Sequence, residues 1–381
     1  MTERPARLTT LQLTHQGEGA GSTQSIFSLS RELALRGHRV LVGCPPGTLL
    51  ARMVSDSGSL LEHVTLDFRR IGPLSDALVR VIADHNVDVV NSHATRDRRA
   101  LTWLRWRGRL PQPFVVTRRT MPLTSPPELV AVGLTADRTI AVSAAVARAL
   151  RRRMHPGGRL RVVPNGIVLQ RIDAQPTPAE LSAAQAVLSG PEADGRAVVV
   201  VVARRKDQQI LLRALSALEH PVTLAFVGIS ADRELAAAQA DVPRRHRVVF
   251  VPFTERPLAF YRFATVAALP SRIEGLSQSL LEAMSLGVPV IASAAGGNPE
   301  LVFPGETGLL VQPLDPPAWT RALDRLLGDP VLRSRVAQGG RALARREFTM
   351  QRTAQRTEVV YAEAIERQLR RGRLLARERA R

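Results

Sequence analysis

The 381-residue sequence has one lysine, one cysteine and few aromatic residues, and these scarcities narrow the possibilities. Cys44 alone builds no disulfide framework, so we expect a reducing compartment. No apolar run approaches the length of a membrane span, and the N-terminal "MTERPARLTT" lacks the apolar core of a signal peptide. These absences predict a cytoplasmic protein, and the 45% hydrophobic content indicates a folded one.

Arginine supplies nearly all of the positive charge, because Lys206 is the only lysine among 53 basic residues. The net charge of +19 raises nucleic acid as a partner, but no zinc spacing, basic heptad or aromatic-interleaved motif supports one. We therefore expect no nucleic-acid partner. A coding preference for arginine and attraction to an anionic membrane surface or an acidic acceptor both remain open. Attraction to an anionic membrane would place the protein peripherally at the inner face of the membrane.

Short runs rich in Val, Ile and Leu alternate with stretches of helical period, such as 22–36 and 278–286. Apolar strands separated by amphipathic helices indicate parallel sheets covered on both faces. We therefore predict an α/β protein with two doubly wound, Rossmann-like domains. The expected strands form two series: 8–13, 40–42, 87–90, 114–116, 139–142 and 161–163, then 197–202, 223–227, 248–250, 265–269, 288–292 and 309–311.

The pattern is weakest around "LQRIDAQPTPAE" and "SGPEADGRA", where Pro, Gly and acidic residues collect. We place the domain boundary near residue 170. This predicts an N-terminal domain over 1–170, a C-terminal domain over 171–350, and a basic helix over 351–381 that packs back toward the N-terminal domain. We expect His38, after a helix end at Gly37, to lie in a surface turn.

A glycine-rich loop, "HQGEGAGSTQ", joins the first expected strand to the first expected helix. Gly17, Gly19 and Gly21 would let the backbone approach a ligand, and the helix N-terminus would offer N–H groups to an anion. A dinucleotide site also needs an acidic residue about 20 positions further on, where this chain has Gly43 and Cys44. The loop therefore does not indicate a bound nicotinamide cofactor.

Two carboxylates in "SRIEGLSQSLLEAMSLGVPVIAS" are candidates for binding a sugar or ribose. On one helix Glu274 and Glu282 would point about 80° apart, so we interpret them as a loop and a helix carboxylate facing one ligand. Gly275 would free the loop, and Ser277 would cap a helix whose N–H groups point at that ligand. A carboxylate readily accepts two hydroxyls. The alternative is a surface acid followed by an ordinary amphipathic helix.

The succession of "EGLSQSLLE", "LGVPVIAS", "GGNPELV" and "GETGLLV" resembles the donor-binding half of the family-4 retaining glycosyltransferases of the GT-B fold. The resemblance extends over nearly the whole chain through "GEGAGSTQSIFSLSRELALRGH", "DVVNSHATRD", "TIAVSAAV" and "RVVPNGI". It implies that the two Rossmann-like domains face a cleft, with the acceptor on the first and a nucleotide-sugar donor on the second. It also implies transfer with retention of configuration, with no metal and no cofactor.

The resemblance assigns roles to individual residues of the second domain. An arginine and Lys206 bind the donor diphosphate, Glu274 the donor sugar, and Glu282 the ribose. Only Arg205 separates Arg204 from Lys206, fewer residues than the family usually has, so either arginine could reach the phosphate. The remaining donor-site candidates are Gly19, Gly21, Gly275, Leu276 and Ser277.

The first domain departs from the family at one position. A histidine after the fourth strand commonly contacts the transferred sugar, whereas "FVVTRRTMPL" has Arg118 and Arg119. His93, at the end of the preceding strand, is the nearest alternative, and we count it with Arg204, Lys206 and Glu274 as catalytic candidates. A structural role for His93 stays open. The paired arginines are candidates for holding an anionic acceptor.

These observations predict a retaining, metal-independent glycosyltransferase that uses a glycan or lipid-linked acceptor, in cell-envelope polysaccharide or glycolipid synthesis. Two other classes remain. A sugar-nucleotide epimerase or hydrolase on the same fold would keep the nucleotide site but need no acceptor. A non-catalytic polyanion-binding protein would release no nucleoside diphosphate and would bind with a steep salt dependence.

The segment "TRDRRALTWLRWRGRLP" places two tryptophans among six arginines. At helical spacing Leu101, Leu104, Trp103 and Trp106 would form an apolar stripe flanked by arginines, Arg105 among them. That composition suits the surface of an anionic bilayer. The alternative is an ordinary helix whose tryptophans face the core.

Overall fold

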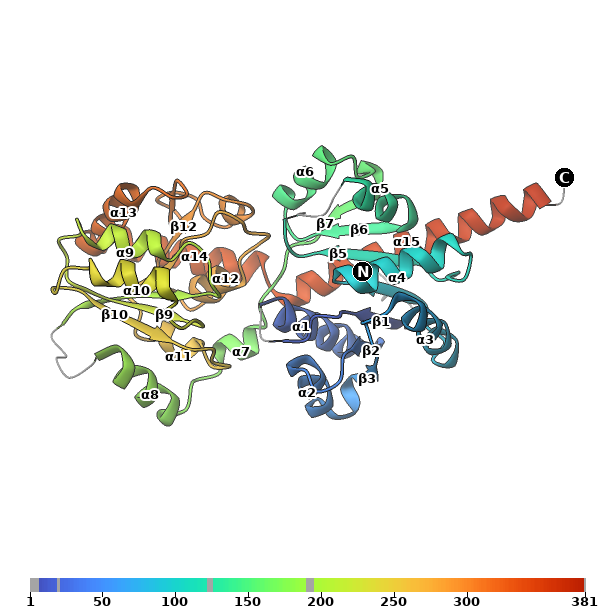
Figure 1. The fold of residues 1–381 in the computed structure, drawn as a ribbon, viewed down its shortest axis with the longest axis horizontal. Helices are drawn as coiled ribbons and strands as arrows, with labels where there is room; N and C mark the ends of the chain where they lie inside the picture. The colour runs from blue at the N-terminus through green and yellow to red at the C-terminus, as the bar shows by residue number, and fades with distance from the viewer. Residues whose placement is uncertain (1–6, 19–20, 122–125, 190–194, 380–381) are drawn as a thin grey trace. The chain divides into compact units, whose positions relative to one another are not determined.

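The chain forms two α/β units, each a parallel sheet covered by helices (Figure 1). A computed structural model describes residues 7–18, 21–121, 126–189 and 195–379. Its contacts group Met1–Gly166 with Met350–Arg381 as unit 1 and Ile167–Thr349 as unit 2. The predicted fold class is therefore confirmed.

Unit 1 contains a seven-stranded sheet in the order β3-β2-β1-β4-β5-β6-β7. Its strands are β1 Thr9–Leu13, β2 Arg39–Cys44, β3 Glu62–Thr65, β4 Val89–Ser92, β5 Phe114–Arg118, β6 Arg138–Ala141 and β7 Leu160–Val162. Its helices are α1 Gly21–Leu35, α2 Leu49–Asp56, α3 Ile71–Asp84, α4 Thr95–Trp106, α5 Pro126–Thr135, α6 Ala144–Arg152 and α15 Met350–Arg379, with short 3-10 turns at Gly58–Leu60 and Gly157–Arg159.

Unit 2 contains a six-stranded sheet in the order β10-β9-β8-β11-β12-β13. Its strands are β8 Ala197–Val202, β9 Val222–Val227, β10 Arg247–Val251, β11 Val266–Leu269, β12 Val290–Ser293 and β13 Leu309–Val311. Its helices are α7 Leu169–Asp173, α8 Pro178–Ser189, α9 Gln209–Leu215, α10 Arg233–Ala240, α11 Leu258–Tyr261, α12 Gln278–Ser285, α13 Pro316–Gly328 and α14 Pro330–Glu347, with a 3-10 turn at Asn298–Glu300.

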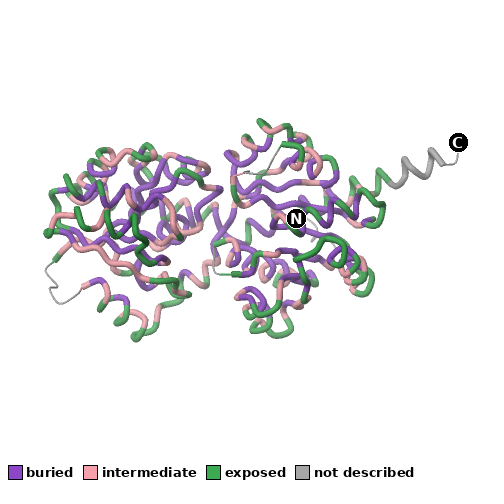
Figure 2. The backbone as a smooth tube through the Cα atoms, in the orientation of Figure 1, coloured by how far each residue is buried: buried purple, intermediate pink, exposed green. Residues whose placement is uncertain are grey.

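The two sheets are the buried centres of their units, and exposed residues collect on the outer helices (Figure 2). In unit 1 Leu11 of β1 lies between Leu41 and Val90 of the neighbouring strands, and all three are fully buried. In unit 2 the valines of β8 pack with Phe226 and the fully buried Trp319. Burial on both faces of a parallel sheet explains why these strands are continuous apolar runs.

Some features differ from the sequence prediction. Strand β3, "EHVT", was not predicted, because its residues are half-exposed and form no apolar run. The segments of weakest patterning contain α7 and only the two ends of α8. The division between units falls after Gly166 and again after Thr349, whereas the predicted boundary was near residue 170.

The long helix α15 packs on unit 1 and contacts α1, β5 and β6. Its Glu358 accepts hydrogen bonds from Arg36 at 2.6 and 2.7 Å and lies 3.0 Å from His38 Nε2. The prediction that His38 lies in a surface turn is wrong, because this contact buries it to 6% exposure. Burial works against ionisation of Glu358, but its bonds to Arg36 and His38 hold its pKa below the usual value.

The four apolar residues of α4 that the sequence predicted to form one stripe do not share one environment. Leu101 and Leu104 are fully buried, whereas Trp103 and Trp106 are 43% and 63% exposed. The alternative in which both tryptophans face the core is therefore also wrong. Arg105 does not flank an exposed stripe either, because it is buried and donates to Asp137 Oδ2 at 2.8 Å.

We expect unit 1 to lose stability in mild acid through His155. Its Nδ1 donates to Pro156 O at 3.2 Å, its Nε2 faces Thr139 Oγ1 at 3.0 Å, and burial lowers its pKa from 6.5 to about 4. The unfolded chain binds a proton at this position below about pH 6.5, and the native chain does not. Stability is therefore lost as the pH falls from 6.5 toward 4, by about 1.5 kcal/mol between about pH 6.5 and 5.

Urea unfolding measured against pH tests this expectation. His155→Gln should flatten the dependence over this interval, whatever its effect at pH 7. An equal slope in wild type and variant would remove His155 as the cause.

Candidate functional site

The loop after β8 carries the three basic residues predicted to meet a diphosphate, and its geometry separates their roles. Its backbone is braced from within: Gln208 Oε1 accepts from Lys206 N at 2.6 Å, and Gln208 Nε2 donates to Arg204 O at 2.7 Å. Asp207 accepts from the backbone N and the side-chain Nε of Arg272, at 2.8 and 3.0 Å. The loop is thereby tied to the segment that follows β11.

Arg205 is fully engaged within its own unit. It donates to Asp232 at 2.6 Å, to Glu234 at 2.5 Å, to Gln209 at 2.9 Å and to Lys206 O at 2.5 Å. Arg204, by contrast, is exposed, and its guanidinium has no hydrogen-bond partner among the described residues. Of the two arginines that the sequence left open, Arg204 is the one available to a ligand.

We expect nucleotide binding to separate these two arginines. Arg204→Gln should weaken the nucleoside diphosphate about tenfold, as loss of one charge-assisted hydrogen bond does. Arg205→Gln should act by loosening the loop, so its effect should shrink when Glu234→Gln has already removed one anchor. Calorimetric titration of the double-mutant cycle measures the coupling. Strict additivity of Arg205→Gln and Glu234→Gln would contradict an anchoring role.

Lys206 and Glu274 meet in an ion pair. Nζ of Lys206 donates to Glu274 Oε1 at 2.6 Å and lies 3.4 Å from Ile273 O. The two side chains are 30% and 11% exposed, so the pair is only partly open to water. The sequence predicted both residues independently, and the structure brings them together at the carboxyl ends of β8 and β11.

A glycine of "GGNPELV" makes room for the loop that carries Glu274. Gly296 has φ +54°, and a Cβ there would lie 1.8 Å from Glu274 O. Only glycine fits both the backbone conformation and this close approach. Sequence reasoning used this motif for the family resemblance but gave its glycines no role.

Helix α12 begins directly after this loop. Ser277 is its N-cap and accepts from Leu280 N at 3.2 Å, as predicted from its residue type. Gly275 and Leu276 are buried beside it. The first N–H groups of α12 have no partner within the helix and carry its positive dipole end, which favours a bound anion.

Glu282 is 5% exposed on α12, and its Oε1 accepts from Arg171 Nη1 at 2.7 Å. Its charge also acts on the buried Tyr261, whose pKa is raised by burial first and by Glu282 second. Sequence reasoning did not identify Arg171, which lies in α7 within the segment of weakest patterning. A ligand hydroxyl at Glu282 would join this existing ion pair.

In unit 1 the glycine-rich loop precedes α1, which begins at Gly21. Gly17 O accepts from Leu50 N at 2.9 Å, and a Cβ on Gly17 would lie 2.4 Å from Thr48 Oγ1. Gly17 therefore serves the packing of this loop against α2. Gly19 lies outside the described residues.

His93 follows β4 and belongs to a buried polar network. Its Nε2 lies 3.0 Å from Gln12 Oε1, which can only accept, so Nε2 carries the hydrogen. The amide of Gln12 donates in turn to the hydroxyl of Tyr361 at 3.0 Å. Nδ1 of His93 faces Arg119 Nη2 at 3.5 Å. Burial first, and Arg119 second, lower the pKa of His93 well below its usual value.

The surroundings of His93 keep its imidazole neutral and hold the ring in a fixed orientation. The backbone around it is held by the fully buried Asp97, whose Oδ2 accepts from Ser92 Oγ at 2.6 Å, His93 N at 3.0 Å and Ala94 N at 2.9 Å. Both ring nitrogens of His93 face protein groups. The network that sets its tautomer depends on Tyr361, a residue of the C-terminal helix that sequence reasoning did not connect to this site.

Arg118 and Arg119 end β5 and begin the following loop. Arg119 Nη1 donates to Asn165 Oδ1 at 2.5 Å, and its Nε is buried without a hydrogen-bond partner among the described atoms. Burial lowers the pKa of Arg119 to about 10 and, assisted by the charge of Arg98, that of Arg118 to about 9. No carboxylate among the described residues pairs with Arg119, so this half-buried guanidinium has no counter-ion at this end of the sheet.

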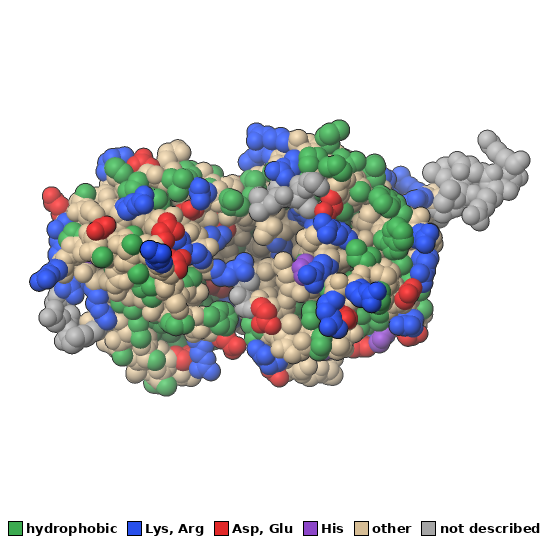
Figure 3. Space-filling model, in the orientation of Figure 1, with side chains coloured by type: hydrophobic (Ala, Val, Ile, Leu, Met, Phe, Trp, Pro, Cys, Tyr) green, Lys and Arg blue, Asp and Glu red, His purple; other side chains and the backbone are tan. Residues whose placement is uncertain are grey.

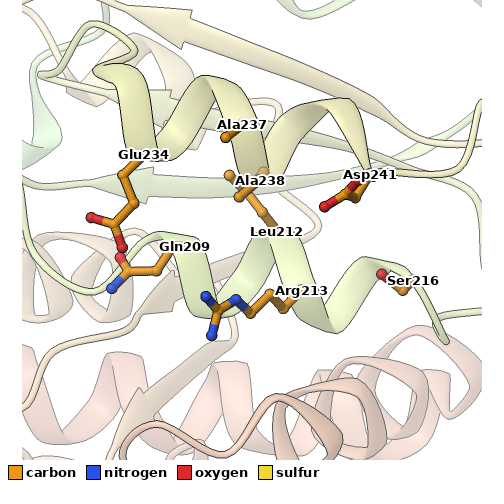
Figure 4. Close-up of a pocket in the computed structure, with 8 residues that line it drawn as sticks. All are labelled: Gln209, Leu212, Arg213, Ser216, Glu234, Ala237, Ala238 and Asp241. Carbon is orange, nitrogen blue, oxygen red and sulfur yellow. The ribbon is translucent and has the colours of Figure 1, made fainter.

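A surface hollow of unit 2 lies elsewhere, between α9 and α10 (Figure 4). Its floor is Leu212, Ala237 and Ala238, and Gln209 and Glu234 stand at one end. These two side chains also accept hydrogen bonds from Arg205, so the hollow adjoins the anchored loop. Within the described residues no group of three or more His, Cys, Asp or Glu side chains is placed to hold a metal ion.

Two protein-family models match the chain. The model described as Glycosyltransferase Family 4 matches residues 19–171, and the model described as Glycosyl transferases group 1 matches residues 196–329. The first match falls mainly in unit 1 and the second within unit 2.

Curated proteins with similar sequences are named as sugar transferases. A D-inositol 3-phosphate glycosyltransferase of Xylanimonas cellulosilytica is 35% identical over 220 residues, which are 55% of this chain and 52% of that protein. A GDP-mannose-dependent alpha-(1-6)-phosphatidylinositol monomannoside mannosyltransferase of Mycolicibacterium smegmatis is 39% identical over 163 residues, 38% of this chain and 42% of that protein. The chain thus spans about half of the length of the curated relatives it matches.

Solved structures share the fold over almost the entire chain. The Anabaena protein HepE in complex with UDP superimposes with a TM-score of 0.76 at 20% identity, covering 93% of this chain and 100% of that one. A glycosyltransferase from Rickettsia africae gives a TM-score of 0.78 at 17% identity, covering 94% and 99%.

Proposed function

We propose that this chain, which belongs to the family-4 glycosyltransferases of the GT-B fold, moves a sugar from a nucleotide-diphosphate sugar to a phosphate-bearing glycan or lipid-linked acceptor. The observation that carries the proposal is the Lys206–Glu274 ion pair beside the N-terminus of α12, in the half that matches the group-1 glycosyltransferase model. We further propose that the transfer proceeds with retention of configuration and uses no metal.

The charged groups of the donor site would come from unit 2. Lys206, the exposed Arg204 and the first N–H groups of α12 would supply positive charge for a diphosphate. Glu274, adjoining Lys206, would accept hydroxyls of the sugar, and Glu282 those of the ribose. The named relatives differ in nucleotide, since one is GDP-mannose-dependent and HepE is bound to UDP, so the proposal leaves the base open.

In the proposed reaction the bond between the sugar's anomeric carbon and the diphosphate breaks, and the departing oxygen takes up negative charge. The acceptor hydroxyl forms a bond to the same face of that carbon, and its proton passes to the departing phosphate. Arg204, Lys206 and the α12 N-terminus stabilise charge that is larger in the transition state than in the bound donor. They would therefore raise the rate and not only the affinity.

The acceptor would bind to unit 1 near Arg119. Arg119 is half-buried, and its shielded Nε has neither a hydrogen-bond partner nor a carboxylate among the described residues, so a bound anion would lower the cost of its charge. Both curated relatives described above carry an inositol phosphate or phosphatidylinositol in their names, and a phosphate of that kind would pair with Arg119. Arg118, which is buried at the end of β5, would add its positive charge to the attraction for this phosphate.

Thermal unfolding in the presence of a panel of nucleotide sugars tests the proposal. A donor at about 100 times its dissociation constant should stabilise the protein by about 2.7 kcal/mol. Incubation of that donor with inositol phosphates and lipid-linked glycans should then release nucleoside diphosphate only when an acceptor is present. Release that no acceptor affects would favour a hydrolase or epimerase, and an absence of stabilisation by every nucleotide sugar would overturn the donor site.

A further inference from the structure

A second surface of unit 1 takes no part in the proposed reaction. It is a groove between α3, α4 and α5, called here the tryptophan groove. Its apolar lining residues are Ile71, Trp103, Trp106, Ala131 and Val132, and Arg99, Thr102 and Glu128 complete it. Figure 3 shows hydrophobic side chains beside Lys and Arg side chains over this part of unit 1.

The lining is unusually open to water for such large side chains. Ile71, Trp103 and Trp106 are 44%, 43% and 63% exposed, whereas Trp319, the third tryptophan of the chain, is fully buried. Contiguous exposed apolar groups of this size mark an interaction surface on a protein more often than chance. In a chain with 4% aromatic residues, two of three tryptophans lie in one groove.

Arginines border the groove along the exposed face of α4. Arg96, Arg99, Trp103 and Arg107 follow each other at intervals of three or four residues, so they lie on one side of the helix. The Arg107 guanidinium stacks over the Trp103 ring at 4.8 Å, and Arg99 donates to Glu128 at 2.8 Å.

The border has an excess of positive charge. Glu128 is paired with Arg99, Asp76 with Arg109 and Asp67 with Arg69, each at 2.8 to 2.9 Å. Three arginines are exposed and make no ion pair with a described residue: Arg70, which precedes Ile71, Arg96 on α4, and Arg107 directly after α4. An occupant of the groove would therefore meet indole rings at its centre and uncompensated arginines at its edge.

We propose that the tryptophan groove docks on the surface of an anionic lipid bilayer. Indole rings are placed favourably at the level of lipid headgroups, and each nearby basic residue adds about a fivefold gain in affinity for anionic lipid. The exposed arginines on both sides of the rings complement the negative charge of headgroup phosphates. No described helix has the length and apolarity to cross a bilayer, so the contact would be peripheral.

Vesicle binding tests the docking without any nucleotide sugar, so its result is independent of the proposed transfer. The full chain is mixed with phosphatidylcholine vesicles, with and without one third phosphatidylglycerol, and followed by co-sedimentation and tryptophan fluorescence. We expect binding to the anionic vesicles only, weakened by salt, with emission shifted to shorter wavelength as Trp103 and Trp106 leave water. Quenching by brominated lipid should accompany the shift.

Matched variants locate the surface. Changing Arg70, Arg96 and Arg107 together to Ser should weaken vesicle binding about 100-fold. The same charge change at Arg233, Arg321 and Arg335, exposed residues of unit 2, should leave it nearly unaltered. Trp103→Ser with Trp106→Ser should abolish the fluorescence shift and most of the binding, and the exposure of both rings predicts an unchanged melting temperature.

Three results would overturn the proposal. The first is a protein that stays in the supernatant with anionic vesicles at low salt. The second is equal weakening by the two arginine triples, which would show attraction by net charge alone. The third is tight vesicle binding by the double tryptophan variant, because it would make the groove irrelevant.

Discussion

Lys206→Ala is expected to lower turnover of the nucleotide sugar about 100-fold or more, the effect of removing one preorganised positive group from a site where charge develops. The side chain is 30% exposed and makes one ion pair, so the melting temperature should change little. Initial rates with the donor identified by thermal stabilisation, together with a melting curve, measure both quantities.

Lys206→Arg is also expected to lower turnover, and this variant is the more specific test because it keeps the positive charge. A planar guanidinium spreads its charge over a fork, whereas the ammonium of Lys206 fits as a point between Glu274 Oε1 and Ile273 O. Arg213→Ala is the matched control, since Arg213 lies on α9 and lines the hollow of Figure 4. A near-normal rate in Lys206→Ala would remove Lys206 from the mechanism.

Glu282→Gln and Glu274→Gln are expected to separate nucleotide binding from sugar binding. Glu282→Gln should weaken both the nucleotide sugar and the free nucleoside diphosphate by about tenfold or more, because the ribose belongs to both. Glu274→Gln should weaken the nucleotide sugar by a similar factor and leave the nucleoside diphosphate nearly unchanged. Calorimetric titration of the two ligands against the two variants gives the four values.

Glutamine is the right substitute at position 274 because of the ion pair that the structure shows. Alanine would release Lys206 from Glu274 Oε1 and so disturb the diphosphate as well, whereas the amide oxygen of glutamine still accepts from Nζ. At position 282 the amide likewise keeps an acceptor for Arg171. Equal losses for both ligands in both variants would contradict the division of roles.

The sequence predicted most of the fold because parallel strands that are buried on both faces consist of continuous apolar runs. The valines of β8 and the apolar run of β11 are examples. It did not reveal β3, whose residues are half-exposed, nor the exposure of Trp103 and Trp106. Helical spacing indicates which residues share a face of a helix, but it does not indicate which face packs against the core. In α4 the two leucines are buried and the two tryptophans, only a few positions away, are exposed.

Local chemistry likewise predicted part of the proposed donor site. The N-cap at Ser277 follows from residue type, and Lys206 was singled out by its rarity. The sequence left the choice between Arg204 and Arg205 open, because both are arginines in the same loop. Their difference comes from Asp232 and Glu234, which lie about thirty positions away in the chain and hold only Arg205.

By itself, then, the sequence determined two parallel-sheet domains, the family, and a set of donor-site candidates, since these depend on periodicity and on residues adjacent in the chain. Only the tertiary structure decided which candidates meet. Tyr361 reaches Gln12 across 349 positions and so sets the hydrogen bond of His93, and Lys206 reaches Glu274 across 68. Lys206 meets Glu274 because the carboxyl ends of parallel strands lie at one edge of a sheet, and Tyr361 meets Gln12 because α15 packs on unit 1. Neither contact can be predicted from a local sequence pattern.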